Sequence, residues 1–175
     1  STLLASSAAS DVYKRQVKDS NIYYTVILML IYTGCRIGEL LDLKKENVNL
    51  EERYFKIVAS KTAAGIRTAP ISKKVYPFFE YWYNLNDCEY LLSTPEGEHF
   101  KYRNYYDSYW SPLIETLGMK HRPHDTRHTC ISMLTVAGVS DKVIKKIIGH
   151  KGQGVTEVVY THFEIEELID AINKI

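Results

Sequence analysis

Arg122-Pro123-His124-Asp125-Thr126-Arg127-His128-Thr129 is the stretch around which this chain is organised, with two cations, two imidazoles and a carboxylate in eight positions. The run that follows, residues 130–137, reads as a mostly buried helix. Pro123 fits the first turn of such a helix, because its missing N–H would have no partner there. His124 and Arg127 then share one face of the helix start, where backbone N–H groups favour an anion. The spacing therefore predicts a phosphate-binding site.

Two other interpretations of this stretch are open. An isolated basic turn is usually a solvated surface. The run from His124 to His128 is also one methylene group away from the His-Glu-x-x-His zinc motif, in which two histidines bind the metal and the acid acts as a base. Arg127 would crowd a dication there, and no third ligand follows at a familiar spacing. We therefore expect no metal and no other cofactor.

Length and composition are those of one soluble globular domain. The chain has 175 residues, 45% of them hydrophobic and 25% charged, which is enough to bury a sizeable core. Its longest apolar run, Tyr23–Tyr32, is too short to span a bilayer. Cys35, Cys88 and Cys130 are odd in number and lack metal-ligand spacing. We therefore expect free thiols in a reducing cytoplasm.

Charge is distributed unevenly along the chain. Residues 1–16 lack the hydrophobic region of a signal peptide and are interpreted as a disordered leader or cloning remnant. The net charge is only +1, and residues 1–100 hold 12 basic and 12 acidic side chains. Residues 101–151 hold 9 and 4, with four of the six histidines, whereas residues 152–175 hold 1 and 5. A basic middle and an acidic tail favour polyanion binding on one face.

Two helices and a small sheet are predicted ahead of residue 72. A helix is expected over Asn21–Tyr32, ended by Gly34, and a shorter one over Cys35–Leu43. Arg36 and Glu39 share a face of the second helix, which a local surface ion pair would also explain.

A change to a two-residue period then predicts strands over residues 48–50, 54–58 and 67–71 in an antiparallel meander. Lys61 lies near the tip of the second hairpin, where a lysine is most often simply solvated.

The rest of the chain is predicted to be helical. Ser72 is expected to cap a helix through Trp82, and Lys101–Leu117 to form a helix with a break or kink at Pro112. The helix that includes residues 130–137 is followed by a basic amphipathic helix over Asp141–Ile148. This pair of helices could instead be a DNA-binding helix–turn–helix.

Two short helices complete the expected chain. The first covers Thr156–His162. The second is an acidic terminal helix with an apolar stripe, covered by its own core or by a neighbouring protomer. The stripe consists of Ile165, Leu168, Ile169 and Ile172.

The order of these motifs resembles the tyrosine recombinase (phage integrase) family over about residues 20–163, and most closely the integrases of conjugative transposons and prophages. The motifs that carry the resemblance are Thr33–Leu40, Lys61 with Gly65 and Arg67, His124–Thr129, Ile148–His150 and Tyr160–His162. The resemblance implies an α+β fold, with a mainly α-helical catalytic domain over residues 17–163 and a small three-stranded antiparallel sheet. It favours packing of residues 164–175 in trans.

The resemblance also implies a role for each polar residue in breaking and rejoining DNA. Tyr160 would attack a phosphodiester and form a 3′-phosphotyrosine, Lys61 would protonate the leaving 5′-oxygen, and Glu39 would support the site. Arginines hold phosphate oxygens without a metal. The residues expected to bind the phosphate or assist the proton are Arg36, Arg127, His150 and His124, and those expected to contact DNA elsewhere are Arg67, Arg122 and Lys151.

The resemblance implies double-stranded DNA as partner and a homo-oligomer assembled on it, a tetramer in full-length members, in a bacterial cytoplasm near the nucleoid. Family members carry an N-terminal DNA-clamping domain. Because the first helix is expected to begin near Asn21, we expect this chain to be the catalytic domain alone. Three rival functions stay open: a type IB topoisomerase-like enzyme, a non-catalytic DNA-binding module that uses residues 139–150, and a zinc hydrolase built on His124 and His128.

Overall fold

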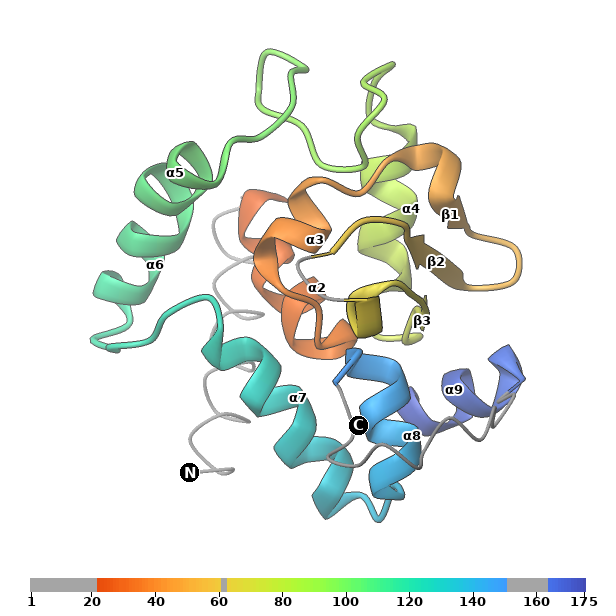
Figure 1. The fold of residues 1–175 in the computed structure, drawn as a ribbon. Coiled ribbons are helices and arrows are strands. Elements are labelled where there is room, and N and C mark those ends of the chain that lie inside the picture. Colours follow the sequence, from red (N-terminus) through yellow and green to blue (C-terminus); the bar gives the residue numbers. More distant parts are fainter. Residues whose placement is uncertain (1–21, 61–62, 151–163) are drawn as a thin grey trace.

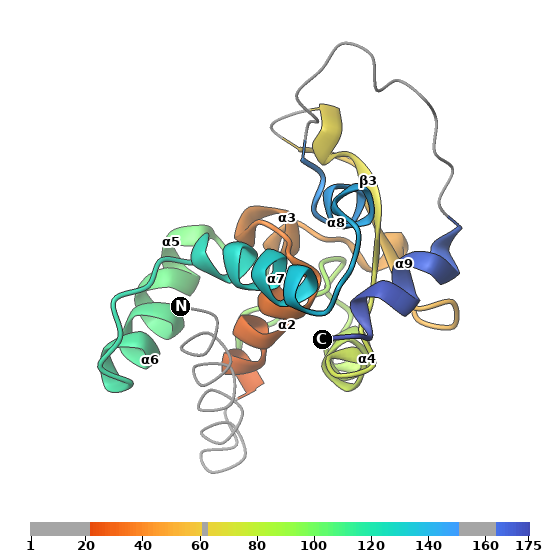
Figure 2. The same cartoon turned by 90° about the horizontal axis from the view of Figure 1, so that it is seen from below.

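The computed structural model describes residues 22–60, 63–150 and 164–175 and places one helix, α2 (Thr25–Thr33), at the centre. This helix packs between α7 (Asp125–Val136) and α4 (Tyr76–Asn84), as Figures 1 and 2 show. Eight of its nine residues are buried, as expected for a helix that is apolar on every face. A 3-10 turn, η1 (Ile22–Tyr24), replaces the first residues of the predicted helix.

Gly34 ends α2 as the sequence predicts. Its φ of 64° is left-handed, and its N–H bonds to the carbonyl of Leu30 at 3.0 Å. The chain then turns at once into α3 (Ile37–Leu41), which is shorter at both ends than the predicted helix. A 3-10 turn, η2 (Lys45–Asn47), leads on to the sheet.

The predicted three-stranded meander is confirmed. The strands β1 (Val48–Asn49), β2 (Tyr54–Ile57) and β3 (Arg67–Pro70) pair antiparallel in the order β1-β2-β3. Phe55 pairs with Ala69 and Ile57 with Arg67, and all four residues are buried. Strand alternation therefore puts the charged Arg67 on the inward face of the sheet. A 3-10 turn, η3 (Ala63–Gly65), lies in the β2–β3 connection.

Two helix predictions in the middle of the chain need correction. Ser72 does not cap α4, because the helix begins only at Tyr76, with Pro77 in its first turn. The predicted kink at Pro112 is a longer irregularity: α5 (Tyr102–Tyr105) continues as a π-helix, η4 (Tyr106–Trp110), and then as α6 (Ser111–Thr116). The N–H of Ser111 bonds to the carbonyl of Tyr106, five residues back. Proline supplies no N–H to an α-helical ladder, so a change of hydrogen bonding beside Pro112 is expected.

The helix α7, which the sequence predicts to follow Pro123, is less buried than expected. Pro123 lies just ahead of α7 rather than inside it, and Val136 is 75% exposed. The buried residues Thr126, Cys130 and Leu134 recur every four positions. One stripe of α7 therefore faces the core.

α8 (Asp141–Ile148) follows the turn at Gly138, and its buried face is packed against β3 and α7. α9 (Ile165–Ile172) packs on β3 and α8 of its own chain (Figure 2). Leu168 and Ile172 on it are buried, and the N–H of Lys73 bonds to the Asn173 side chain at 2.9 Å. The apolar stripe is thus covered in cis in this single chain, and packing in trans stays a prediction. The helix predicted over Thr156–His162 lies outside the described residues.

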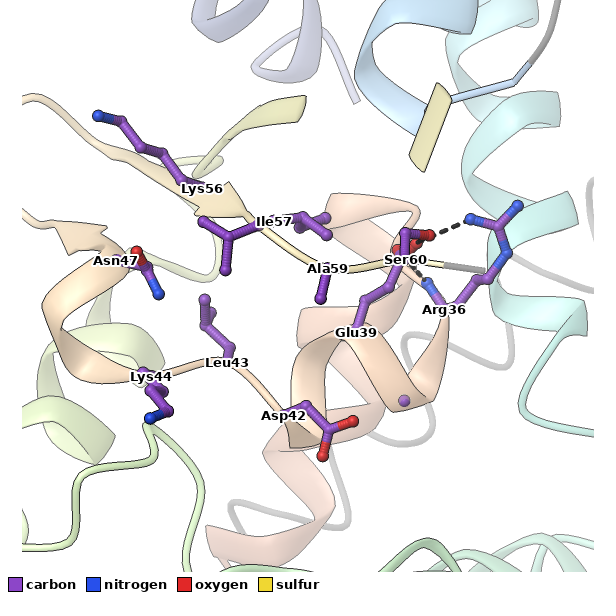
Figure 3. Close-up of a pocket in the computed structure, with 12 residues that line it drawn as sticks. Arg36, Glu39, Asp42, Leu43, Lys44, Asn47, Lys56, Ile57, Ala59 and Ser60 are labelled. Atoms are coloured by element: carbon purple, nitrogen blue, oxygen red, sulfur yellow. Dashed lines mark hydrogen bonds and ion pairs between the residues drawn. The ribbon is translucent and has the colours of Figure 1, made fainter. Parts of the chain in front are cut away.

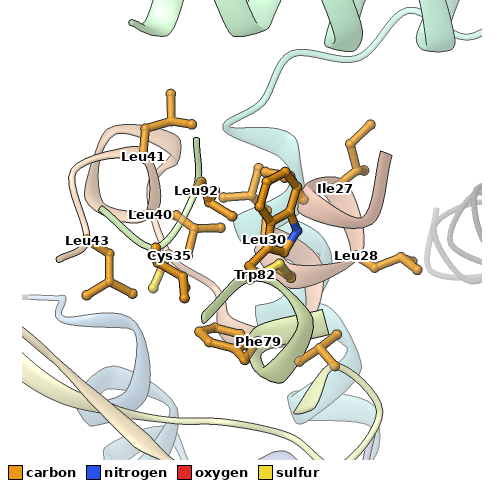
Figure 4. Close-up of a cluster of buried hydrophobic side chains, with 14 of the residues drawn as sticks. Ile27, Leu28, Leu30, Cys35, Leu40, Leu41, Leu43, Phe79, Trp82 and Leu92 are labelled. Atoms are coloured by element: carbon orange, nitrogen blue, oxygen red, sulfur yellow. The ribbon is translucent and has the colours of Figure 1, made fainter. Parts of the chain in front are cut away.

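Buried side chains from α2, α3 and α4 form the main core (Figure 4). Trp82 is fully buried and its indole N–H bonds to the hydroxyl of Thr25 at 3.0 Å. Each such apolar side chain contributes about 1.5–3 kcal/mol on burial, so this core holds α3 and the sheet in fixed relation. Within the described ranges, no helix is long and apolar enough to cross a membrane.

Candidate active site

Arg36 and Glu39 form a short charged unit at the start of α3. Arg36 is the N-cap, and its backbone N–H donates to Glu39 Oε2 at 3.0 Å. Its guanidinium Nη1 donates to Glu39 Oε1 at 2.7 Å (Figure 3). The Arg36 side chain is 31% exposed and that of Glu39 only 5%. The carboxylate therefore holds the arginine from behind while the guanidinium reaches the surface.

Glu39 collects donors from three segments of the chain. Besides Arg36 it accepts from the Ser60 hydroxyl at 3.1 Å and from Arg67 Nη2 at 3.1 Å. Burial opposes its charge, but the hydrogen bonds and charge of Arg67, with those of Arg36, hold its pKa below the usual range. The carboxylate is therefore ionised at neutral pH, which fits the supporting role predicted for it.

Arg127 lies on α7, and one side of its guanidinium is hydrogen-bonded to the backbone. Nη1 donates to the carbonyl of Gly34 at 2.9 Å, whereas Nη2 is buried and has no hydrogen-bond partner among the described residues. Burial lowers the pKa of Arg127 to about 10, and the charges of Arg36 and Arg67 add to this effect. The guanidinium stays protonated at neutral pH, so a buried cation with a spare donor adjoins Arg36.

Gly34 is required where it stands. A Cβ at this position would lie 3.0 Å from Ile148 Cγ2 and 3.1 Å from Cys130 Sγ, at a positive φ. A side chain would therefore combine left-handed strain with crowding. The glycine lets the end of α2 approach both α7 and α8, and its carbonyl orients Arg127.

The imidazole of His124 lies one turn ahead of Arg127 and is exposed. Its ring meets that of His128 edge-on, with centroids 5.0 Å apart. Partial burial lowers the pKa of His124, and the neighbouring His128 and Arg127 lower it further. The imidazole is therefore mostly neutral at pH 7 and can accept a proton.

His150 follows the end of α8. Gly149 caps this helix in a left-handed conformation with φ of 68°, and the His150 N–H bonds to the carbonyl of Lys145 at 3.1 Å. The preceding turn is fixed by Arg67, whose Nε donates to the carbonyl of Ile147 at 2.7 Å. His150 is thus presented by a turn that is anchored to the sheet.

Two residues predicted to contact DNA have different surroundings. Arg122 is exposed beside α7, as a DNA contact requires. The prediction for Arg67 needs correction, because its side chain is only 2% exposed and is engaged by Glu39, Gly65 and Ile147. The predicted site residues Lys61, Lys151 and Tyr160 lie outside the described residues.

Sequence reasoning missed the groups that organise these cations. They are the Gly34 carbonyl, the Ser60 hydroxyl and the buried guanidinium of Arg67. The sequence does not show which backbone carbonyl will accept a hydrogen bond from a distant side chain. Arg67, however, alternates with Ala69 and Ile71, and an arginine in phase with apolar strand residues could have been read as buried.

A groove of about 350 Å³ runs from Arg36 between α3 and β2 (Figure 3). Lys44 and Lys56 line it farther from Arg36. Within the described part of the chain, no three His, Cys, Asp or Glu side chains are grouped to share a metal ion. His124 and His128 therefore have no third such ligand there.

The fold and the site together define a helix-rich domain that brings the cationic side chains of Arg36, Arg67 and Arg127 near one another. The chain belongs to the phage integrase family, whose family model matches residues 5–167.

Among curated relatives it is similar to tyrosine recombinase XerA of Pyrococcus horikoshii, at 28% identity over 98% of this chain and 61% of the relative. A tyrosine recombinase of Agathobacter rectalis is also 28% identical, over 96% of this chain and 56% of the relative. The chain thus spans a little over half the length of these relatives.

Solved structures confirm the predicted fold class. A crystal structure of XerA recombinase matches with a TM-score of 0.67 at 20% identity, over 94% of this chain and 55% of that one. The Tn1549 transposon integrase, solved in complex with circular intermediate DNA, matches with a TM-score of 0.65 at 22% identity, over 75% of this chain and 51% of that one.

Proposed function

We propose that this chain is the catalytic part of a site-specific DNA recombinase that cleaves and rejoins DNA through a 3′-phosphotyrosine. The observation that carries the proposal is the joint presentation of Arg36 and Arg127. One guanidinium rests on Glu39, the other on the Gly34 carbonyl with a buried donor to spare. Phosphoryl transfer needs chiefly positioning and charge stabilisation, which two such arginines supply.

In the proposed cleavage step, the oxygen of Tyr160 bonds to phosphorus as the bond to the 5′-oxygen breaks. Lys61 gives a proton to that oxygen and leaves a free 5′-hydroxyl. A phenol has a pKa of ~10, so it must lose its proton to a base or in a field of cations. We assign this assistance to neutral His124, with His150 as a further donor to the phosphate. Attack by a 5′-hydroxyl on the phosphotyrosine reverses the step without ATP.

The proposed substrate is a double-stranded recombination site. Arg122 and Lys151 would contact the DNA backbone beside the scissile phosphate, and the resulting salt dependence is that of any phosphate contact. In the longer protein we infer a separate DNA-clamping domain and assembly of a homo-oligomer on DNA. Action in a bacterial cytoplasm, on the DNA of a mobile element, follows from the same proposal.

Covalent trapping tests the proposal. Suicide duplexes with a nick near the scissile phosphate, drawn from a library of inverted repeats, are incubated with the chain in excess EDTA. A protein–DNA adduct that survives denaturing electrophoresis is expected, because arginines carry the charge that a metal would. Loss of cleavage in EDTA with recovery on adding zinc would instead favour the His124–His128 hydrolase. Adducts on every duplex, whatever its sequence, would favour a topoisomerase.

A further inference from the structure

Arg67 is a buried cation that contacts three separate segments of the site. Its Nε donates to the Ile147 carbonyl of α8 at 2.7 Å, and its Nη1 to the Gly65 carbonyl at 2.8 Å. Its two terminal nitrogens also donate to Glu39, at 3.3 Å and 3.1 Å. Nη2 further lies 3.6 Å from the Cys35 sulfur. The planar guanidinium presents donors in fixed directions, which a lysine cannot do.

Each of these contacts leads to a different group of the proposed mechanism. Glu39 holds Arg36. Gly65 closes the β2–β3 connection that contains Lys61, and it packs so closely on Ser60 that a Cβ there would lie 1.9 Å from the Ser60 hydroxyl. Ile147 lies three residues before His150. One guanidinium thus links Glu39 on α3, Gly65 in the β2–β3 connection and Ile147 on α8.

The charge of Arg67 matters as well as its shape. Glu39 is 5% exposed and ionised, and it accepts from both Arg36 and Arg67. With Arg67 present, the negative charge of Glu39 is compensated from the buried side of the site. The positive charge of Arg36 is therefore not neutralised by Glu39 alone. Without Arg67, Arg36 would be the main counter-ion of Glu39 and would bind a phosphate less strongly.

We propose that Arg67 is a positioning residue that holds Arg36, the β2–β3 connection at Gly65 and the His150 turn in one arrangement, and that it does not contact DNA. The inference rests on the proposed function, because it concerns the same site. Displacing a catalytic group by about 1 Å can cost about 100-fold in rate. Loss of Arg67 is therefore expected to lower the rate of cleavage far more than the affinity for DNA.

The test compares Arg67→Lys and Arg67→Gln with a matched core variant, Phe79→Leu. Phe79 is fully buried against Phe55, away from these contacts, so its variant controls for lost stability. Amide hydrogen exchange of the free proteins reports the arrangement without any reaction. Single-turnover adduct formation and the DNA Kd report its effect on chemistry. Using two substitutions keeps the test decisive if one of them does not fold.

In the Arg67 variants, exchange is expected to speed up together at the Leu40, Ile66 and His150 amides, but not at Leu117 of α6. All four amides are hydrogen-bonded in the structure. The adduct rate is expected to fall by about 100-fold while the Kd changes by less than about 3-fold. Phe79→Leu is expected to keep the wild-type adduct rate at equal loss of Tm.

Unchanged exchange at those three amides, or a fall in adduct rate no larger than that of Phe79→Leu, would overturn the inference. A weaker Kd with an unchanged single-turnover rate would assign Arg67 to DNA binding and would overturn it too. If the wild-type chain forms no adduct, the proposed function fails, while the exchange result still decides whether Arg67 joins the three segments.

Discussion

Arg127 on α7 donates a hydrogen bond to the carbonyl of Gly34, 93 residues earlier in the chain, at 2.9 Å. This contact joins the end of α2 to α7 and fixes one side of the Arg127 guanidinium. The other terminal nitrogen, Nη2, is buried and unpaired among the described residues. A buried donor without a partner costs free energy, and a bound phosphate oxygen would satisfy it.

Replacing Arg127 by glutamine removes the charge and the spare donor. We expect the rate of adduct formation to fall by about 100- to 1,000-fold, because one preorganised donor contributes that much to stabilising a developing charge. Single-turnover trapping on saturating suicide DNA measures the effect. Arg103→Gln, at an exposed position on α5, is the control and should leave the rate unchanged. A similar loss in both variants would point to non-specific weakening of DNA binding.

Gly34→Ala tests whether the turn depends on glycine. The left-handed backbone alone costs roughly 1–2 kcal/mol for an L-residue, and contacts of 3.0 Å to Ile148 and 3.1 Å to Cys130 add crowding. We expect a lower free energy of unfolding in urea, by at least about 1 kcal/mol. Gly38→Ala is the matched control, since a Cβ there meets nothing within 4 Å. Equal stability of the two variants would contradict the assigned role of Gly34.

The titration of His124 reports the electrostatics of the site. Burial, His128 and Arg127 lower its pKa, so in the free protein its NMR midpoint should lie below the usual ~6.5. Because the folded pKa is lowered, any contribution of His124 to stability is complete above the unfolded pKa and is lost as pH falls through the folded value. His128→Gln should raise the midpoint towards ~6.5. A midpoint above the usual value in the wild type would refute this description.

Lys61→Ala tests the proposed general acid. A 5′-thiolate leaves without a proton, so a DNA substrate with a 5′-bridging sulfur does not need the acid. The variant should cleave ordinary DNA far more slowly than wild type and the sulfur-containing DNA at nearly the wild-type rate. Lys56→Ala, on β2, serves as the control. If Lys61→Ala slowed both substrates equally, the lysine would be a binding residue instead.

Local signals predicted much of the fold. Strand alternation gave the meander, and Gly34 marked a helix end that the structure confirms with a positive φ. The late start of α4 was missed because Ser72 looked like a cap, and the π-helix because i→i+5 bonding has no sequence pattern. The start of α4 and the π-helix both depend on how neighbouring elements pack.

The order of the motifs along the chain indicated the candidate site more clearly than any single residue did. Arg36 and Glu39 looked like an ordinary ion pair, and only the structure adds Ser60 and Arg67 to the same carboxylate. The family resemblance alone implied that Arg67 contacts DNA, whereas the structure buries its side chain. Its burial depends on contacts with α3 and α8, which are distant in sequence.

The assignment of Tyr160 as nucleophile is the central claim, and trapping with Tyr160→Phe tests it most directly. The substitution removes only the phenolic oxygen, so DNA affinity in a gel-shift titration should stay within about 3-fold, a change of under ~0.7 kcal/mol. Tyr102→Phe, at an exposed tyrosine on α5, should form the adduct at the wild-type rate. We predict no covalent protein–DNA adduct with Tyr160→Phe on suicide DNA that traps the wild type, and an undiminished adduct would contradict the account.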